Sequence, residues 1–244
     1  MTNSYRQLRS GSAGALVCFP WAGAGSLPFR SWRPHLPDGL ALWVARTAGK
    51  EDRLREPAPA DWPELVRDLT DDLPTGTPLV FFGHCLGAVM AFEVALELHR
   101  RKLAPPRRLI AVGMPPTLFP TQDFSLELHE AVRESGTVPE EVLNDPDLFS
   151  MIAPAIRADL DLAARYRRQE GRRVDIPVDV LLPSSASSED LGTARAWAVD
   201  TTQSVDVHTI DGDHLMPHGA WPALATAVTG TATGALAAAQ PAAG

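Results

Sequence analysis

The chain has 244 residues, a length that one α/β domain commonly occupies, so a single domain over 1–244 is the simplest expectation. With 45% hydrophobic and 21% charged residues, the composition is typical of a globular protein and argues against disorder. The net charge of −8 provides no general attraction for nucleic acid, although a local cluster of arginines could still bind an acidic partner.

The two cysteines, Cys18 and Cys85, form neither a disulfide framework nor a zinc-binding spacing. The first residues lack a basic segment followed by an apolar run, and no stretch reaches the roughly 18 apolar residues of a membrane-spanning helix. We therefore expect a cytoplasmic protein that has no membrane partner and uses no metal or cofactor.

Short apolar runs alternate with longer helix-like segments, which is the pattern of a mostly parallel sheet flanked by helices. The sequence therefore predicts the α/β class. In chain order we expect strands at 15–20 and 40–45, a helix at 62–73 after the N-cap Asp61, a strand at 79–82, a helix at 88–101, and strands at 109–114, 178–182 and 205–210.

Two segments do not fit this alternation. Residues 117–171 contain helix-like runs but no strand-like run, which predicts a helical lid inserted over the sheet. Residues 234–244 are mostly alanine with glycine and proline, and we interpret them as a flexible tail; an alanine-rich helix end is the alternative.

The strand at 79–82 leads into Gly83-His84-Cys85-Leu86-Gly87, and a helix follows. Gly-x-Ser-x-Gly between a buried strand and a helix is the nucleophile elbow of the α/β-hydrolase fold, a sharp turn in which flanking side chains would strike the neighbouring helix and strand. We interpret Cys85 as a nucleophile in place of serine. The alternative is a buried thiol between two turn glycines. Cys18 lies within a strand and is assigned to the core.

An elbow cysteine lies at a helix N-terminus, which predicts a pKa below the ordinary value of about 8.5. The oxyanion formed when its thiolate attacks a carbonyl needs hydrogen-bond donors. The backbone N–H of Leu86 is one candidate, because it follows the nucleophile. The second is the N–H of Ala22, in a loop of small residues after the first predicted strand. A plain Gly/Ala turn is the alternative for that loop.

In this fold the general base is a histidine after the last strand, and His214 follows the strand at 205–210. His218 is the second choice. The acid that orients the base normally follows the strand at 178–182, where Asp190 and, less favourably, Glu189 are available. Both could instead lie in the first turn of the next helix. A Cys-His dyad without an acid is the third possibility, since a thiol ionises more easily than a hydroxyl.

These residues together resemble the type II thioesterases of polyketide synthase and nonribosomal peptide synthetase systems, over about residues 16–221. The similar segments are CFPWAG at 18–23, AGKEDR at 48–53, GHCLGA at 83–88, AIRADL at 155–160, AW at 196–197 and DGDH at 211–214. The chain departs from the family pattern at three positions. The nucleophilic serine is Cys85, the histidine of the oxyanion loop is Trp21, and the usual aspartate position falls on Ala186.

The resemblance implies an enzyme that takes acyl groups from the phosphopantetheine thiol of an acyl or peptidyl carrier protein, and usually hydrolyses them. The departures leave an acyltransferase or cyclase, which releases the acyl group to an amine or thiol instead of water, as an alternative, and a non-catalytic carrier-binding or acyl-binding module as a second one. Carrier proteins are generally acidic, so a basic docking patch is expected. Candidates are Arg100, Arg101, Lys102, Arg107 and Arg108, unless they are simply a solvated helix end and loop.

Overall fold

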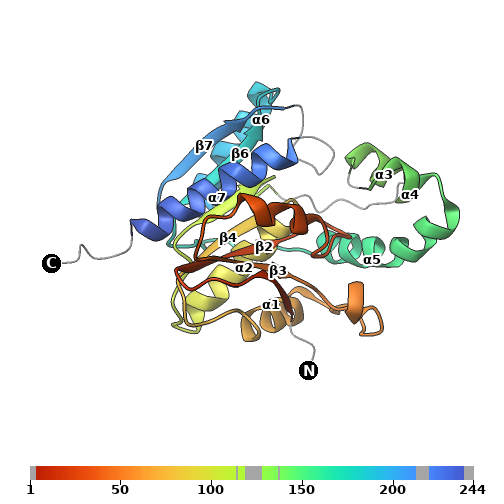
Figure 1. Cartoon of the computed structure of the whole chain (residues 1–244), viewed down its shortest axis with the longest axis horizontal. Helices are drawn as coiled ribbons and strands as arrows, with labels where there is room; N and C mark the ends of the chain where they lie inside the picture. Colours follow the sequence, from red (N-terminus) through yellow and green to blue (C-terminus); the bar gives the residue numbers. More distant parts are fainter. Residues whose placement is uncertain (1–3, 114, 119–127, 137, 213–219, 239–244) are drawn as a thin grey trace.

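A seven-stranded sheet forms the centre of the molecule in the computed structural model, which describes residues 4–113, 115–118, 128–136, 138–212 and 220–238 (Figure 1). The strand order is β1-β3-β2-β4-β5-β6-β7, and every neighbouring pair except β1–β3 is parallel. The strands are β1 (Tyr5–Arg9), β2 (Gly14–Phe19), β3 (Leu40–Ala45), β4 (Leu79–His84), β5 (Leu109–Val112), β6 (Val178–Pro183) and β7 (Val205–Ile210).

The predicted α/β architecture is confirmed, because six of these strands match the apolar runs of the sequence. Strand β1 was not predicted. It lies at the sheet edge and pairs antiparallel with β3, and only its first residue, Tyr5, is buried. An edge strand with one covered face does not need the continuous apolar run that marks a buried parallel strand.

Helices cover both faces of the sheet (Figure 1). One face packs on α1 (Trp62–Asp71), α2 (Leu86–Arg100), α6 (Ser188–Arg195) and the 3₁₀ helix η3 (Ala196–Val199), and the other packs on η1 (Pro28–His35) and α7 (Trp221–Ala237). Asp61 caps α1 as predicted, because its side chain accepts a hydrogen bond from the Glu64 N–H at 2.8 Å.

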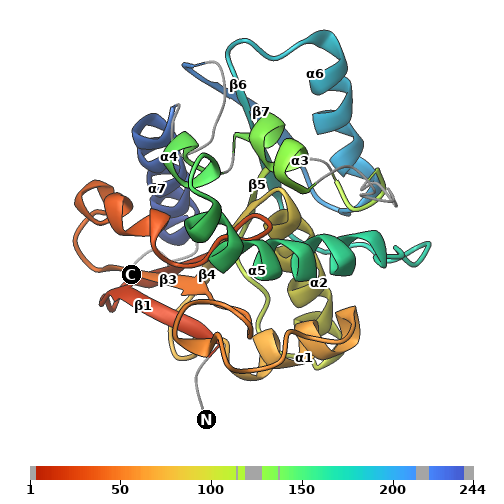
Figure 2. The same cartoon turned by 90° about the vertical axis from the view of Figure 1, so that its right-hand side faces the viewer.

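Between β5 and β6 the chain forms α3 (Leu128–Ser135), α4 (Glu140–Leu143) and α5 (Pro146–Ala164). These helices lie beyond the carboxyl ends of the parallel strands, on the side of the molecule away from the C-terminus (Figures 1 and 2). They have a small apolar core of their own, which includes Leu128, Val132, Leu143 and Ile156. Their position agrees with the predicted lid, whose extent as a separate unit stays a prediction.

The end of the chain follows the helical alternative up to Ala237, the last residue of α7. Leu236 packs against the second face of the sheet, where an added Cβ on Gly14 would lie 2.6 Å from the Leu236 side chain. Partial burial of this leucine and the high helix propensity of alanine explain the extension. The end of the predicted tail, 239–244, lies outside the described residues.

No helix of the described residues is both long enough and apolar enough to cross a membrane.

A short 3₁₀ helix, η2 (Glu51–Arg53), lies between β3 and α1 and contributes to the site described next.

Candidate functional site

Cys85 occupies the single residue between β4 and α2, with backbone angles φ 53° and ψ −120°. This is a region that residues with a side chain rarely adopt, and such strain is characteristic of a nucleophile elbow. The Cys85 N–H donates to the Val112 carbonyl at 2.7 Å and thereby ties the turn to the neighbouring strand. The geometry thus agrees with the elbow predicted from the sequence.

Three glycines make room for this turn. A Cβ on Gly83 would lie 2.4 Å from Ala88 Cα, and one on Gly87 would lie 1.9 Å from the Phe19 carbonyl oxygen. Both contacts are with backbone, so neither can be relieved by a side-chain rotation. Gly113 was not singled out in the sequence, yet it has φ +121° and a Cβ there would lie 3.2 Å from Cys85 Cα. Its position directly after a strand was the available signal.

Cys85 as a whole residue is exposed to solvent, but protein atoms are packed around its sulfur and affect its acidity. Burial of the sulfur raises the pKa of the Cys85 thiol, and the hydrogen bond from the Leu86 N–H opposes this. The net change is upward, so the prediction of a lowered pKa is wrong. Loss of hydration outweighs the helix N-terminus here. A thiol that is mostly protonated near neutral pH needs a base to become a nucleophile.

The loop after β2 is held by hydrogen bonds from its own N–H groups. The Gly23 N–H donates to Asp159 Oδ2 at 2.7 Å, the Ala24 N–H to the Trp21 carbonyl at 3.0 Å, and the Ser26 N–H to Glu51 Oε1 at 2.6 Å. The Ala22 N–H has no acceptor within the described part of the chain. It is therefore available to a ligand, as expected of an oxyanion donor.

Helix α5 supports this loop from outside. The Asp159 carboxylate, 6% exposed, accepts from both Gly23 and the buried ammonium of Lys50. Ile156, one turn earlier on α5, packs so closely that a Cβ on Gly23 would lie 2.4 Å from its Cγ1. Lys50 and Asp159 lie in two of the segments that resemble the type II thioesterases, but the sequence analysis assigned them no role. Only the fold shows that they meet.

Trp21 replaces the histidine of the family pattern and is 3% exposed. Its ring packs edge-on against His84 at 5.3 Å and against Trp221 at 5.6 Å between centroids. Burial lowers the pKa of His84 to about 3, so this imidazole stays neutral near neutral pH. His84 is thus a packing residue beside the elbow.

The predicted bases, His214 and His218, lie outside the described residues. The chain just before them is placed: the Ser184 N–H donates to the Ile210 carbonyl at 2.8 Å, and the Gly212 N–H donates to Ser184 Oγ at 3.2 Å. The loop after β7 therefore starts beside the loop after β6. Both lie at the carboxyl edge of the sheet, the edge at which Cys85 ends β4.

Asp190 is the third residue of α6 and takes part in its capping box. Its carboxylate accepts from the Ser187 N–H and Oγ, each at 2.8 Å, while the Asp190 N–H donates back to the Ser187 hydroxyl. Glu189 lies exposed in the same first turn. This is the helix-opening alternative of the sequence analysis. A contact between Asp190 and His214 stays a prediction, as does the Cys-His dyad.

Comparison with known proteins agrees with this geometry. The family model described as "Thioesterase domain" matches residues 15–230. This chain belongs to the thioesterase family. Thioesterases are found both among its relatives and among its structural neighbours, and the protein is a thioester hydrolase.

Individual relatives cover most of the chain. It is 27% identical to the medium-chain S-acyl fatty acid synthase thioesterase of Rattus norvegicus, covering 82% of this chain and 80% of the relative. It is 29% identical to thioesterase PikA5 of Streptomyces venezuelae, covering 86% and 78%. The type II thioesterase BorB of the borrelidin biosynthetic cluster superposes with a TM-score of 0.79 at 27% identity, covering 97% of this chain and 100% of BorB.

Proposed function

We propose that this protein is a type II thioesterase of a polyketide or nonribosomal peptide pathway that removes acyl groups from carrier-bound phosphopantetheine. Similarity to PikA5 and to the type II thioesterase BorB supports the pathway class. The observation that carries the chemistry is Cys85 in the strained elbow conformation, with the Ala22 N–H lacking an acceptor among the described residues.

In the first half-reaction, His214 takes the proton of Cys85 and the Sγ attacks the carbonyl carbon of the acyl thioester. The N–H groups of Ala22 and Leu86 donate to the oxyanion that forms. Collapse of this intermediate breaks the bond between the acyl carbon and the pantetheine sulfur. The leaving thiolate takes the proton from His214, and the acyl group remains on Cys85 as a new thioester.

In the second half-reaction, His214 removes a proton from water, which attacks the Cys85 thioester. The same two N–H groups stabilise the second oxyanion. Cys85 leaves as a thiolate and regains the proton from His214, and the free acid is released. Asp190 is the proposed orienting acid, with Glu189 or an unassisted dyad as the alternatives.

Acyl transfer to an amine or thiol is the second candidate function, and Trp21 favours it. This buried apolar ring stands where the family has a polar histidine beside the oxyanion loop. A thioester on Cys85 is also more readily attacked by amines than an oxygen ester is. In this version the acceptor replaces water in the second half-reaction, and the product is an amide or a new thioester.

Acyl-loaded carrier protein incubated with wild type, Cys85→Ser and Cys85→Ala would test these functions by mass spectrometry of products and of the intact enzyme. Free acid from the wild type, lost in Cys85→Ala, supports hydrolysis. An adduct on Cys85 released only when an amine or thiol is added supports transfer. Absence of both free acid and adduct would leave the non-catalytic binding module as the remaining function.

A further inference from the structure

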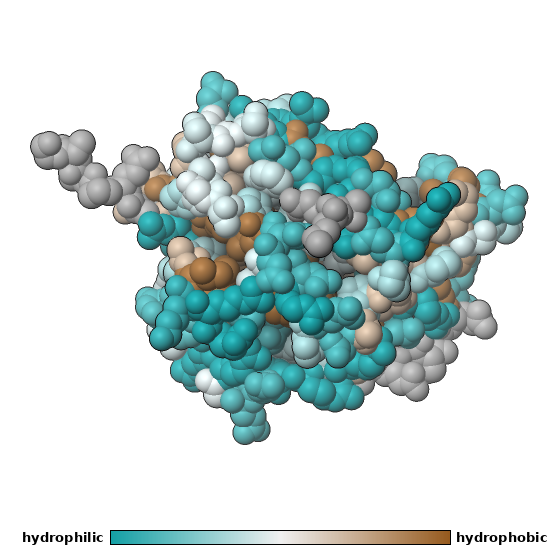
Figure 3. All heavy atoms as spheres, turned by 90° about the horizontal axis from the view of Figure 1, so that it is seen from below, coloured by the Kyte–Doolittle hydropathy of each residue, from teal (hydrophilic) through white to brown (hydrophobic). Residues whose placement is uncertain are grey.

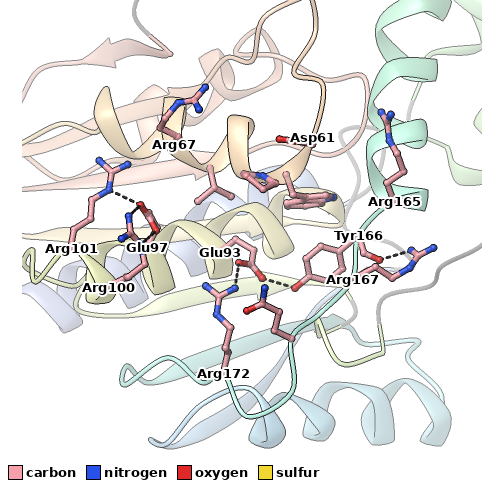
Figure 4. A pocket seen from close by; sticks show the side chains of 14 residues that line it. Asp61, Arg67, Glu93, Glu97, Arg100, Arg101, Arg165, Tyr166, Arg167 and Arg172 are labelled. Atoms are coloured by element: carbon pink, nitrogen blue, oxygen red, sulfur yellow. Dashed lines mark hydrogen bonds and ion pairs between the residues drawn. The ribbon is translucent and has the colours of Figure 1, made fainter.

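A groove of about 580 Å³ lies between α1, α2 and the segment that follows α5, outside the elbow site (Figure 4). Six guanidinium groups and three carboxylates line it, so the lining residues alone carry a net charge of +3 in a chain whose total charge is −8. Arg67 and Arg101 also pair with carboxylates just outside the lining, those of Glu64, Asp68 and Asp71. The charged residues are Arg67, Arg100, Arg101, Arg165, Arg167 and Arg172, and Asp61, Glu93 and Glu97.

The Glu97 carboxylate is occupied by hydrogen bonds from two arginines of the groove. It accepts hydrogen bonds of 2.6 Å from Arg100 Nε and Nη2 and from Arg101 Nε. The hydrogen bond from Arg100 is the main reason that the pKa of Glu97 is lowered to about 2. This carboxylate is therefore ionised at physiological pH and holds two arginine side chains along one wall.

The Glu93 carboxylate is also occupied by hydrogen bonds, and these join α2 to the segment after α5. It accepts from the Tyr166 hydroxyl at 2.8 Å and from Arg172 Nη1 at 3.3 Å. The Tyr166 ring packs on Trp62 with 4.7 Å between ring centroids, and both side chains are buried. The floor of the groove is thus aromatic, and its walls are charged (Figure 4).

Arg165 and Arg167 differ from the other arginines of the groove. Arg165 Nε donates to the Asp161 carbonyl at 3.0 Å, and Arg167 Nη1 donates to the carbonyls of Ala164 and Tyr166 at 2.8 and 2.7 Å. Neither has a carboxylate partner within the described residues, and both side chains are exposed. No described carboxylate compensates their charges, and a guanidinium group can bind a carboxylate through two parallel N–H groups.

We propose that this groove docks an acidic surface helix of the carrier protein, with Arg165 and Arg167 as the principal contacts; this rests on the proposed function. An acidic partner would be repelled by most of this chain and attracted here. The groove draws on three separate elements and has an aromatic floor, which suits a helix carrying carboxylates around an apolar side chain. The face on which α1 lies is mostly hydrophilic (Figure 3).

The groove flanks helix α2, whose first residue follows Cys85. Glu93 is eight residues after Cys85, a distance of about 12 Å along the helix axis. The other lining residues of this helix and its C-cap extend to Arg101, about 24 Å from Cys85 along the axis, so the acyl arm of a carrier bound there has to span this distance to reach the elbow.

The residues of the basic patch expected from the sequence do not all lie together in the folded protein. Arg100 and Arg101 line the groove, but Arg108 pairs with buried Asp179 at 2.7 Å, and Arg107 lines a different hollow. The arginines that matter most, Arg165 and Arg167, come from the far end of the lid segment. Sequence distance hid their proximity to α2.

The experiment compares Arg165→Glu/Arg167→Glu with wild type on two substrates, an octanoyl-loaded acyl carrier protein and octanoyl-pantetheine. A matched control is Arg30→Glu/Arg33→Glu, which reverses two exposed arginines of η1 on the other face of the sheet. We expect the double groove variant to raise KM for the carrier substrate at least tenfold at low salt. The effect should shrink as salt is added, and turnover of octanoyl-pantetheine should not change.

An unchanged KM for the carrier in Arg165→Glu/Arg167→Glu, or an equal rise in the η1 control, would overturn the docking site while leaving the proposed function intact. A wild type that cleaves octanoyl-pantetheine but not the loaded carrier would overturn the carrier-directed function, and the docking proposal with it. A loss of octanoyl-pantetheine turnover in the groove variant alone would show that these arginines serve the elbow, which also contradicts docking.

Discussion

Two buried aspartates hold the lid segment, and they connect it to different parts of the molecule. Asp159 on α5 binds Gly23 of the oxyanion loop and Lys50. Asp200, after η3, is completely buried. It binds Thr117 at the start of the lid segment, through the N–H and hydroxyl, and Arg168 after α5.

The two aspartates therefore have different roles: Asp200 stabilises the lid segment, and Asp159 positions the oxyanion loop. Asp200 ties together the two ends of the inserted segment, and its hydrogen bonds within the described residues go to neither Cys85 nor the oxyanion loop. Asp159 orients the peptide next to the proposed Ala22 donor. If the contacts determine function, damage at Asp159 should slow acylation and also leave the buried Lys50 ammonium unpaired, whereas damage at Asp200 should weaken the fold without slowing acylation.

Asp159→Ala should produce the largest catalytic effect. Without its carboxylate, Gly23 loses an acceptor and the loop loses its support, so we expect acylation of Cys85 by octanoyl-pantetheine to slow by about a hundredfold, near the loss seen when an oxyanion donor is removed. Rapid-quench mass spectrometry measures this rate. Alkylation of Cys85 by iodoacetamide forms no oxyanion and should change less than twofold. Equal losses in both reactions would mean that the elbow itself is damaged.

Gly23→Ala should have the next largest effect. The new Cβ would lie 2.4 Å from Ile156 Cγ1 in a backbone of φ +78°, so the loop and α5 must move apart. We expect acylation to slow by about tenfold, with no change of charge. The same rapid-quench assay applies, with Gly76→Ala as the control, since Gly76 also has positive φ but no atom lies near its added Cβ. A wild-type rate in Gly23→Ala would argue against coupling between α5 and the loop.

Asp200→Ala should lower the stability of the fold and leave the acylation rate nearly unchanged. Removal of one partner leaves the Arg168 guanidinium unpaired in a mostly buried position, which costs about 3 kcal/mol of the free energy of unfolding. Urea denaturation measures this loss, and acylation below the transition should stay within about threefold of wild type. A catalytic loss as large as that of Asp159→Ala would remove the distinction between the two aspartates.

The ionisation of Cys85 should be the property least affected by either aspartate. Because burial raises the pKa of the thiol, the thiolate fraction should rise with pH through a midpoint above the ordinary value of about 8.5. The pH dependence of iodoacetamide alkylation reports this midpoint. We expect the same midpoint in wild type, Asp159→Ala and Asp200→Ala. A midpoint below 8 in the wild type would show that the helix N-terminus dominates after all.

Much of the fold could be predicted from the sequence because parallel strands buried on both faces leave continuous apolar runs. Strands β2 to β6 are largely buried in this way, whereas β7, at the other edge of the sheet, has only one buried residue. Helices α1 and α2 were predicted from helix-like apolar spacing and, for α1, from its N-cap. Strand β1 has a mixed polar sequence and gains its place by pairing with β3, so its sequence alone did not reveal it. The helical end of α7 likewise depends on Leu236 reaching the sheet.

The elbow was the most predictable part of the site, because Gly83, Cys85 and Gly87 are close in sequence and sterically linked to one turn. The sequence by itself therefore determined the fold class, the position of Cys85 and the edge of the sheet where its partners must gather. Tertiary structure alone decided the rest. It joined Lys50, Gly23 and Asp159 across more than a hundred residues, and it surrounded the Cys85 sulfur closely enough to raise the pKa of the thiol. Such outcomes depend on distances and hydration that arise only when separate elements pack together.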